Sequence, residues 1–420
     1  MISLPARCAR RAYAATLAVC LLAAPALPAT DWPQWLGPKR DGGTDEKVAP
    51  WKDGLKIAWK AKVGEGHCGP IVADKMVFLH TRTPGSDTEE VSAFDAGGGA
   101  LLWQKSYKRG KFSSIFGNGP RATPSYDAGK VYTFGVTGIL TCLDAKDKGA
   151  ILWQRDTLKD FKAANLFFGV SCSPLIDQEK LLMNVGGKGA SIVAFDKADG
   201  KVIWKSLDDK ASYASPIIYG AGAERTALFL THAGLVAVAV KDGAIRWRLP
   251  FEDKLAESST TPVKIGDTII ASSITRGTVG LHVEGADKVV KDWEKTDLTC
   301  YFSTPVAVGT DHVFLVAGTP PPSLSAKATL HCVEVKSGKS LWRRPNVGSY
   351  HASLLRTGDG KLLLLEEKGD LVLLDPNPKE YRELARANVC GKTWAHPALA
   401  NGRLYVRDNG HLYCVELKGE

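Results

Sequence analysis

A short strand–turn–strand unit recurs along this chain, and its clearest copy lies between Ile192 and Trp204. Apolar residues alternate as far as Asp196, a turn ends at Gly200, and a second apolar run ends at Trp204. Alternation places apolar side chains on one face of a strand, and glycine takes the left-handed turn position, so the unit predicts a β-hairpin. One hairpin is too small to bury its own apolar face. The unit must therefore stack on its neighbours.

Related copies end at further tryptophans, which we expect to pack between neighbouring units. These predicted structural tryptophans are Trp59, Trp103, Trp153, Trp204, Trp247, Trp293 and Trp342. A second phrase lies between them: a small or hydroxyl residue, a proline and an apolar run. It occurs at Gly69-Pro70, Thr123-Pro124, Ser173-Pro174, Ser215-Pro216, Thr261-Pro262, Thr304-Pro305 and His396-Pro397. A degenerate copy at His351–Leu354 fills the one interval that is about twice as long as the others.

The chain thus holds eight copies at a spacing of roughly 40–50 residues, which is the period of four-stranded propeller blades. The first tryptophan strand, at Trp59, has no hairpin partner before it, and the final hairpin, which ends at Glu416, has no tryptophan strand after it. We therefore predict an all-β, eight-bladed β-propeller of four-stranded blades. The Trp59 strand pairs with the C-terminal blade and closes the ring, so that no sheet edge is left exposed. In the seventh blade, Leu384 stands where a tryptophan is expected.

Three segments follow from this pattern. Residues 1–29 combine an arginine-rich start, an apolar run and small residues ending at Ala29, which predicts a cleaved signal peptide. No transmembrane segment is expected after cleavage, and the mature protein is expected in the periplasm or secreted. Cys20 is a poor candidate for a lipid anchor, because apolar residues continue after it. Residues 30–55 form an extension whose aromatic side chains we expect against the side or bottom of the propeller, and residues 56–420 form the propeller itself.

Composition limits the classes of partner. The formal net charge is +9, but the basic residues form neither a stripe nor a known nucleic-acid-binding motif, so no nucleic-acid partner is expected. The 42 glycines and 22 prolines suit a chain made of turns and short strands rather than long helices. We expect a monomer whose partner is another envelope protein or macromolecule.

The repeated Ala-Phe-Asp-x-x-x-Gly-Lys-x-x-Trp pattern and the Ser/Thr-Pro strand start resemble the pyrroloquinoline-quinone (PQQ) repeat family of β-propellers. Within that family, the chain is similar to small exported bacterial PQQ-like proteins, which are likened to the outer-membrane protein assembly lipoprotein. Three stretches carry this likeness: Trp35–Gly42, Leu158–Phe161 and Trp394–Pro397. The resemblance implies the propeller fold over nearly all of the mature chain. It says little about function, because one fold hosts many activities.

The same family includes quinoprotein dehydrogenases, many of which carry two adjacent cysteines, and which bind Ca²⁺ through carboxylate and amide oxygens. This chain has nine cysteines, none adjacent to another, and no cluster of acids near the strand starts. The recurring acids, such as Asp95 and Asp196, stand at turns and are interpreted as structural. We therefore predict no catalytic residues, no metal and no cofactor, PQQ included. An oxidoreductase that uses PQQ or a metal remains the alternative.

Large and polar side chains recur three places before each proline position, while the two places between are mostly small. If the proline strand is the innermost of each blade, as the resemblance implies, this position forms a ring at one mouth of the central channel. The ring consists of His67, Arg121, Ser171, Tyr213, Ser259, Phe302, Tyr350 and Trp394, and we expect His396 to reach the same opening. Such side chains are typical of binding hot spots.

The favoured function is a non-catalytic envelope scaffold that binds a protein or ligand at this ring. A binder of glycans or small molecules, and a ring that only packs around water, remain the other interpretations.

Overall fold

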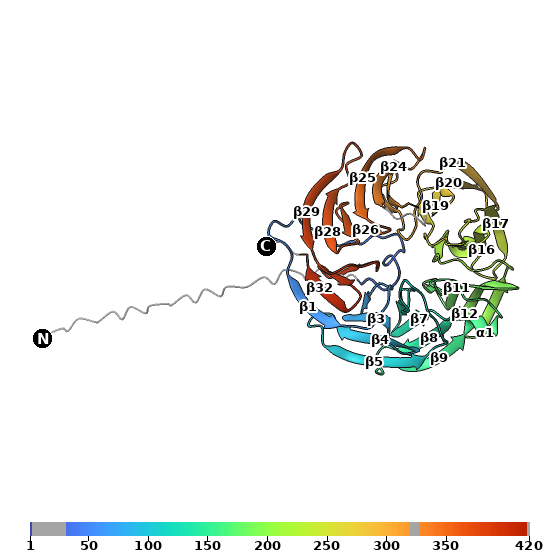
Figure 1. Cartoon of the computed structure of the whole chain (residues 1–420), viewed down its shortest axis with the longest axis horizontal. Coiled ribbons are helices and arrows are strands. Elements are labelled where there is room, and N and C mark those ends of the chain that lie inside the picture. Colours follow the sequence, from blue (N-terminus) through green and yellow to red (C-terminus); the bar gives the residue numbers. More distant parts are fainter. Residues whose placement is uncertain (2–30, 320–326, 418–420) are drawn as a thin grey trace.

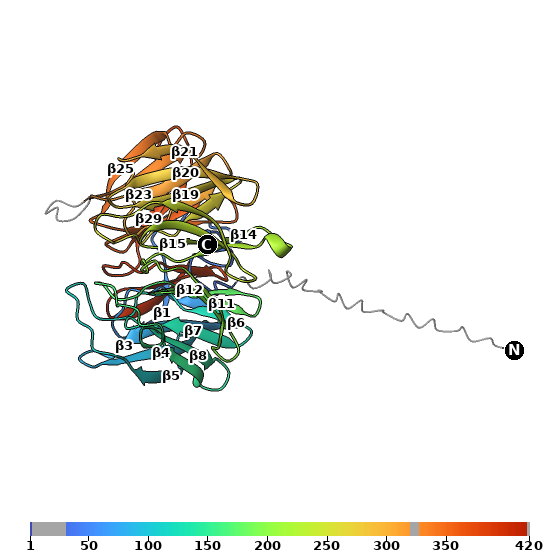
Figure 2. The same cartoon turned by 90° about the vertical axis from the view of Figure 1, so that its right-hand side faces the viewer.

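The computed structural model describes Met1, residues 31–319 and residues 327–417; the predicted signal peptide and Cys20 lie outside these ranges. Eight four-stranded antiparallel sheets are arranged around a central axis, as predicted (Figure 1). Helical structure within the described residues is limited to α1 (Thr157–Asp160) and one 3-10 turn (Gly222–Glu224). Figure 2 shows the ring from its side.

Each blade begins with its innermost strand at the axis and ends with its outermost strand at the rim. Blade one has β2 (Ile71–Ala73), β3 (Met76–Arg82), β4 (Thr88–Asp95) and β5 (Leu101–Lys108). Blade two has β6 (Ser125–Asp127), β7 (Lys130–Phe134), β8 (Ile139–Asp144) and β9 (Ala150–Asp156). Blade three has β10 (Leu175–Asp177), β11 (Lys180–Gly187), β12 (Ala190–Asp196) and β13 (Val202–Ser206). Blade four has β14 (Ile217–Tyr219), β15 (Thr226–Leu230), β16 (Gly234–Ala239) and β17 (Ile245–Pro250).

The second half repeats this order. Blade five has β18 (Val263–Ile265), β19 (Thr268–Ser273), β20 (Gly277–Glu284) and β21 (Lys288–Lys295). Blade six has β22 (Val306–Val308), β23 (His312–Ala317), β24 (Ala328–Glu334) and β25 (Ser340–Gly348). Blade seven has β26 (Ala352–Arg356), β27 (Leu362–Glu366), β28 (Asp370–Asp375) and β29 (Arg382–Asn388). Blade eight has β30 (Ala398–Ala400), β31 (Arg403–Arg407), β32 (His411–Glu416) and, as its outer strand, β1 (Ile57–Lys62).

The ring is closed by pairing between the two ends of the described chain. β1 lies antiparallel to β32, with Trp59 opposite Cys414 and Lys62 opposite His411. The predicted closure is therefore confirmed. Since each innermost strand follows the proline position, the strand starts and the connectors between blades lie on one face, which we call the mouth face. The turns between third and fourth strands lie on the opposite face.

The tryptophans of the outer strands bind the neighbouring blade in a repeated way. Trp204 Nε1 donates to the carbonyl oxygen of Val240 (3.0 Å) in the next blade, as Trp103 does to Ala145 (2.9 Å). The indole also covers the turn glycine of that blade. A Cβ atom at Gly243 would lie 2.4 Å from the Trp204 ring, so only glycine fits beneath it. The same contact recurs at Trp59, Trp103, Trp153 and Trp293.

Blade seven departs from this pattern, and the structure corrects the sequence alignment there. The residue opposite Leu373 is Ala385, whereas Leu384 occupies the β-bulge that precedes the tryptophan position in the other blades. The reason lies in blade eight, whose third and fourth strands come from opposite ends of the chain. No hairpin turn joins them, so a tryptophan in blade seven has no turn glycine to cover.

Hydroxyl groups link the inner strands around the axis. The backbone N–H of Gly69 donates to Thr123 Oγ1 (3.1 Å), that of Thr123 to Ser173 Oγ (3.0 Å), and that of Ser173 to Ser215 Oγ (2.9 Å). The same bond joins Thr261 to Thr304. Serine or threonine before the proline therefore satisfies a buried backbone donor of the preceding blade.

The first part of the N-terminal segment, which carries Trp32 and Trp35, lies in the centre of the ring rather than against its side or bottom, which corrects the sequence-based expectation for these two side chains (Figure 1). Trp51, later in the segment, packs with the core of blades seven and eight. Trp32 is 1% exposed and pairs with Val72 of the inner strand β2. Trp35 reaches the axis, where its Nε1 donates to Thr261 Oγ1 (2.9 Å). Arg40 donates to the carbonyl oxygens of Pro174 (2.9 Å) and Pro216 (3.0 Å). The expectation was wrong because the segment contains no repeat that would indicate its place.

Candidate functional site

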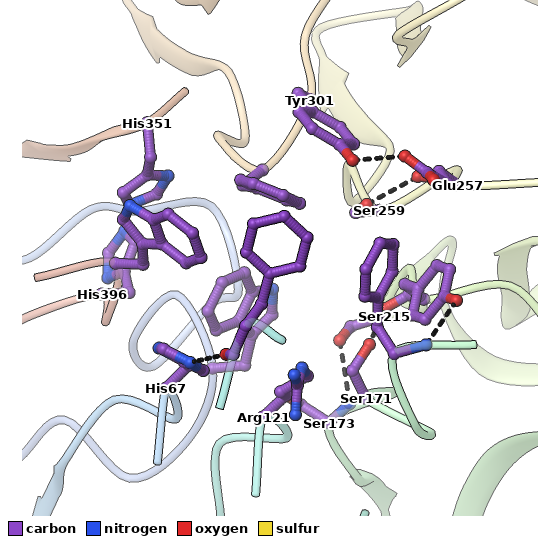
Figure 3. A pocket seen from close by; sticks show the side chains of 16 residues that line it. His67, Arg121, Ser171, Ser173, Ser215, Glu257, Ser259, Tyr301, His351 and His396 are labelled. Carbon is purple, nitrogen blue, oxygen red and sulfur yellow. Dashed lines mark hydrogen bonds between the residues drawn. The ribbon is translucent and has the colours of Figure 1, made fainter. Parts of the chain in front are cut away.

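A pit of about 140 Å³ lies where the inner strands begin, at the centre of the mouth face (Figure 3). The structure brings together eight of the nine predicted ring residues as its lining: His67, Arg121, Ser171, Tyr213, Ser259, Phe302, Trp394 and His396. Tyr350 does not line the pit, but its ring contacts that of Trp394 edge-on, with 6.3 Å between centroids. Trp35 also contributes to the lining, so the N-terminal segment forms part of the floor.

The pit has further lining residues that the sequence analysis missed. They are Phe116, Phe168, Ser173, Ser215, Glu257, Tyr301 and His351. Ser173, Ser215 and His351 belong to repeated positions next to the ring, so the repeat contained a signal for them. Phe116 and Phe168 lie on connectors between blades, where no repeat indicates which side chain turns inward.

Trp394 forms the centre of an aromatic wall. Its ring lies 5.4 Å from His67, 5.7 Å from Phe302 and 5.9 Å from Phe116 between centroids. Its Nε1 donates to Glu367 (2.9 Å), a carboxylate that is 2% exposed. Burial alone would raise the pKa of Glu367, but bonds from Trp394 and its other donors hold that pKa below its ordinary value. Glu367 therefore stays charged and fixes the orientation of the indole.

Phe168 continues the wall on the opposite side. Its ring lies 5.6 Å from Phe116 and 5.7 Å from Tyr213 between centroids. The backbone N–H of Phe168 donates to the hydroxyl of Tyr213 (3.1 Å), which holds the connector against the ring position. Two connectors that are separated in sequence thus each supply one phenyl ring to the pit.

The connector that carries Phe116 is held by a buried polar cluster. Glu89 is fully buried, accepts a hydrogen bond from the Tyr107 hydroxyl (3.1 Å) and lies 3.6 Å from Arg109 Nη1. Burial raises and the His80 hydrogen bond lowers the pKa of Glu89, with a net decrease. Arg109 in turn donates to the carbonyl oxygen of Asn118 (2.7 Å) in the connector. The cluster therefore anchors the connector to blade one.

One guanidinium and one carboxylate line the pit. Arg121 lines it and donates to the carbonyl oxygens of Gly117 and Gly119 (both 3.0 Å). Burial lowers its pKa to about 10, which leaves it protonated at neutral pH. The one lining carboxylate, Glu257, accepts a hydrogen bond from the Tyr301 hydroxyl, and burial raises its pKa.

The three histidines near the pit are neutral at neutral pH. Burial, with Arg121 nearby, lowers the pKa of His67 to about 4, and burial lowers that of His396 to about 4. The pKa of His351 falls to about 3, mainly through burial and then through His396. Each ring makes hydrogen bonds: His67 donates to the Phe116 carbonyl (2.7 Å) and His351 lies between two serine hydroxyls. The two ring nitrogens of His396 face the carbonyls of Pro397 (3.0 Å) and Leu354 (3.2 Å), and the single N–H of the neutral ring donates to one of them. They shape the pit rather than titrate in it.

Within the described ranges, no group of three or more His, Cys, Asp or Glu side chains is arranged to hold a metal ion. The seven cysteines in those ranges are buried and free. No helix of the described chain is long and apolar enough to cross a membrane.

Comparison with known proteins places these features in a family. The profile of the family described as outer membrane protein assembly factor BamB matches residues 87–344. Outer membrane protein assembly factor BamB of Yersinia pestis is 22% identical over 304 residues, which cover 70% of this chain and 73% of that protein.

Solved structures of two kinds of protein share this fold. BamB from Moraxella catarrhalis has a TM-score of 0.60 at 17% identity, covering 87% of this chain and 98% of that one. Quinohemoprotein alcohol dehydrogenase from Comamonas testosteroni has a TM-score of 0.63 at 15% identity, covering 93% and 81%. At these identities the likeness concerns the fold alone.

Proposed function

The chain belongs to the family of outer membrane protein assembly factor BamB, a PQQ-like propeller family, and from this premise we propose that it is a non-catalytic propeller of the cell envelope. It binds a partner protein through its mouth face, and the name of its relatives suggests a partner in outer-membrane protein assembly. We propose a periplasmic or secreted location for the mature chain and a monomeric state.

The observation that carries this proposal is the set of exposed apolar side chains around the pit. Ile115 is 88% exposed, Phe167 77%, Leu255 41% and Phe116 39%. Ile115 and Phe116 line a groove on one side of the pit, and Phe167 and Leu255 line a groove on the other. Both grooves share residues with the pit, so the three form one hollowed surface. Exposed apolar surface of this kind is typical of protein interaction sites.

An oxidoreductase is the second candidate, because the quinohemoprotein dehydrogenase shares the fold. The residues at the mouth do not fit a quinone held with Ca²⁺. The lining supplies one carboxylate, Glu257, whose pKa is raised, while Ca²⁺ prefers six or more oxygen ligands.

The test is partner capture from the envelope of the native host with cross-linking. The mouth variant combines Ile115→Ser with Phe167→Ser, and the matched control combines Leu102→Ser (50% exposed) with Ile203→Ser (44% exposed) on outer strands. We expect the mouth variant to capture at least about tenfold less partner, since exposed hot spots carry most of the binding energy. Equal loss in both variants, or loss in the control alone, would move the interface to the rim of the propeller.

The oxidoreductase alternative has its own assay. Mature protein incubated with pyrroloquinoline quinone and Ca²⁺ is expected to reduce no dye above background with alcohols or sugars. Turnover that is lost on chelation would overturn the non-catalytic proposal.

A further inference from the structure

We propose that the pit binds a small amphipathic anion, namely a single aromatic ring that carries one carboxylate. This inference deepens the proposed function, because it rests on the mouth being a binding surface. The proposed function concerns a partner protein on the surrounding loops, whereas this inference concerns a small molecule inside the pit.

The size and walls of the pit select the apolar part of the ligand. Its volume of about 140 Å³ resembles the roughly 150 Å³ of an apolar cavity that takes up benzene. The walls are the rings of Trp394, Phe302, Phe116 and Phe168, which surround the space from several sides. Aromatic rings pack edge-to-face or offset on one another, so a planar ring is the group that these walls fit best.

Two hydroxyl groups at the floor of the pit are free to donate a hydrogen bond to a ligand. Ser173 Oγ accepts from the N–H of Thr123, and Ser215 Oγ accepts from the N–H of Ser173. Both hydroxyls line the pit, and within the described chain no acceptor is found for the hydrogen of either one. A ligand oxygen that reaches the floor would accept these two hydrogens.

A buried cation lies directly behind that floor. Arg40 is 3% exposed, and its Nη2 donates to the carbonyl oxygen of Ser173 itself (3.2 Å). Its other partners are the carbonyls of Pro174 and Pro216 and the side-chain oxygen of Gln34, and no carboxylate pairs with it among the described residues. A buried guanidinium without a carboxylate favours an anion nearby, because its charge is poorly screened.

The rim carries a second guanidinium, that of Arg121. Arg121 uses two of its five N–H donors on Gly117 and Gly119, which leaves others for a ligand. The Glu257 carboxylate, the one negative group of the lining, is bonded to Tyr301. The pit therefore combines apolar walls, donor hydroxyls and two guanidinium groups, which suits a ring with one carboxylate.

The experiment compares matched ligands on the complete mature protein. Binding of 3-phenylpropionate, its uncharged analogue 3-phenylpropionamide, the cation 3-phenylpropylamine and ring-free propionate is followed by saturation-transfer NMR and tryptophan fluorescence. We expect 3-phenylpropionate to bind with a Kd between about 0.1 and 1 mM, the range for a ligand of this size. The amide should bind about tenfold more weakly, since it loses the charge-assisted hydrogen bonds.

Two variants test whether Arg121 causes the preference for the carboxylate over the amide. Arg121→Met should reduce the difference between carboxylate and amide to less than about threefold without weakening the amide. Arg343→Met removes an exposed arginine of β25 and serves as the control, with wild-type preference expected.

Equal affinity for the carboxylate, the amide and the amine would overturn the inference and leave the pit as an apolar anchor. Failure of all ring compounds to bind would overturn it as well. Either outcome leaves the partner-capture result intact, so failure here and failure of the proposed partner surface are distinguishable.

Discussion

Two positions recur from blade to blade in this propeller, the tryptophan of the outer strand, present in seven of the eight blades, and the ring residue at the mouth, and they behave differently. Six of the seven tryptophans donate through Nε1 to a backbone carbonyl in the next blade. The seventh, Trp247, donates to the Tyr219 hydroxyl within its own blade. The mouth position instead holds side chains from serine to tryptophan, and they make different contacts in each blade.

The difference separates two kinds of repeated position. A side chain that packs on the turn of the next blade is constrained to one size, and the tryptophan is absent where that turn is missing, as at Ala385. The mouth position faces the axis, where eight side chains share one space and need only fill it together. Variation there is compatible with the fold, and it is what a recognition surface requires.

The largest expected effect comes from the N-terminal segment and β1, which carries the first of the repeated tryptophans, Trp59. Deleting residues 31–62 should abolish cooperative unfolding and cause aggregation, because it exposes the β32 edge and removes the centre of the ring. Circular dichroism melting and size-exclusion chromatography measure this. Deleting only residues 31–46, which keeps β1, should lower stability but retain a cooperative transition. If the longer deletion melts like the complete mature chain, closure through β1 does not stabilise the ring.

The next effect tests the tryptophan position. Trp204→Ala should lower the free energy of unfolding by about 3–5 kcal/mol, since the indole is buried and its cavity is large. Gly243→Ala, which adds a Cβ at 2.4 Å from that ring, should destabilise the wild type more than it destabilises Trp204→Ala. Denaturant unfolding of the wild type, the two single variants and the double variant gives the coupling free energy between Trp204 and Gly243. Additive effects would mean that the ring and the turn do not touch in solution.

A smaller effect concerns acid. The pKa of His396 is about 4 in the folded protein against an ordinary 6.5, mainly because of burial, so the unfolded chain binds the proton more readily. The contribution of His396 is complete above pH 6.5 and is lost as the pH falls from 6.5 to 4, by up to roughly 3 kcal/mol. Denaturant unfolding of wild type and His396→Gln at pH 7 and pH 4.5 measures it, with His312→Gln as control. An identical pH dependence in all three proteins would contradict the neutral, buried state of His396.

The smallest effect is expected at the mouth. Tyr350→Ala should lower the free energy of unfolding by about 1 kcal/mol or less, because the side chain is half-buried and only its backbone N–H bonds Glu367. Thermal melting of Tyr350→Ala, Trp204→Ala and the wild type compares the two losses of stability. A cost near that of Trp204→Ala would mean that the two repeated positions are equally structural.

The blades and their closure could be predicted from the sequence because both depend on local patterns. Alternation, turn glycines and the Ser/Thr-Pro phrase each recur, and two unpaired ends imply one seam. The alignment failed at Leu384 because the connection between the third and fourth strands is longer in blade seven: Asp375 and Ala385 are ten residues apart, whereas Asp196 and Trp204 are eight apart.

The site was predictable in part for the same reason. Ring residues such as Arg121 and Trp394 follow from position in the repeat, whereas Trp35, Phe116 and Phe168 come from segments that have no copies. Their places depend on contacts distant in sequence, such as Trp35 to Thr261, and no periodicity encodes those. The hydroxyl residues before five of the seven prolines recur visibly in the sequence, but their role as acceptors between blades depends on how neighbouring blades meet.

The pairing of β1 with β32 also bears on the order in which the molecule is built. A ribosome makes β1 among the first residues of the propeller and β32 among the last, and chains fold as they emerge. Blades one to seven have all of their strands before the final hairpin is made, but β1 waits for it. A chain that stops before Ala398 therefore leaves β1 without the strand that pairs with it, in a form that proteases and chaperones recognise.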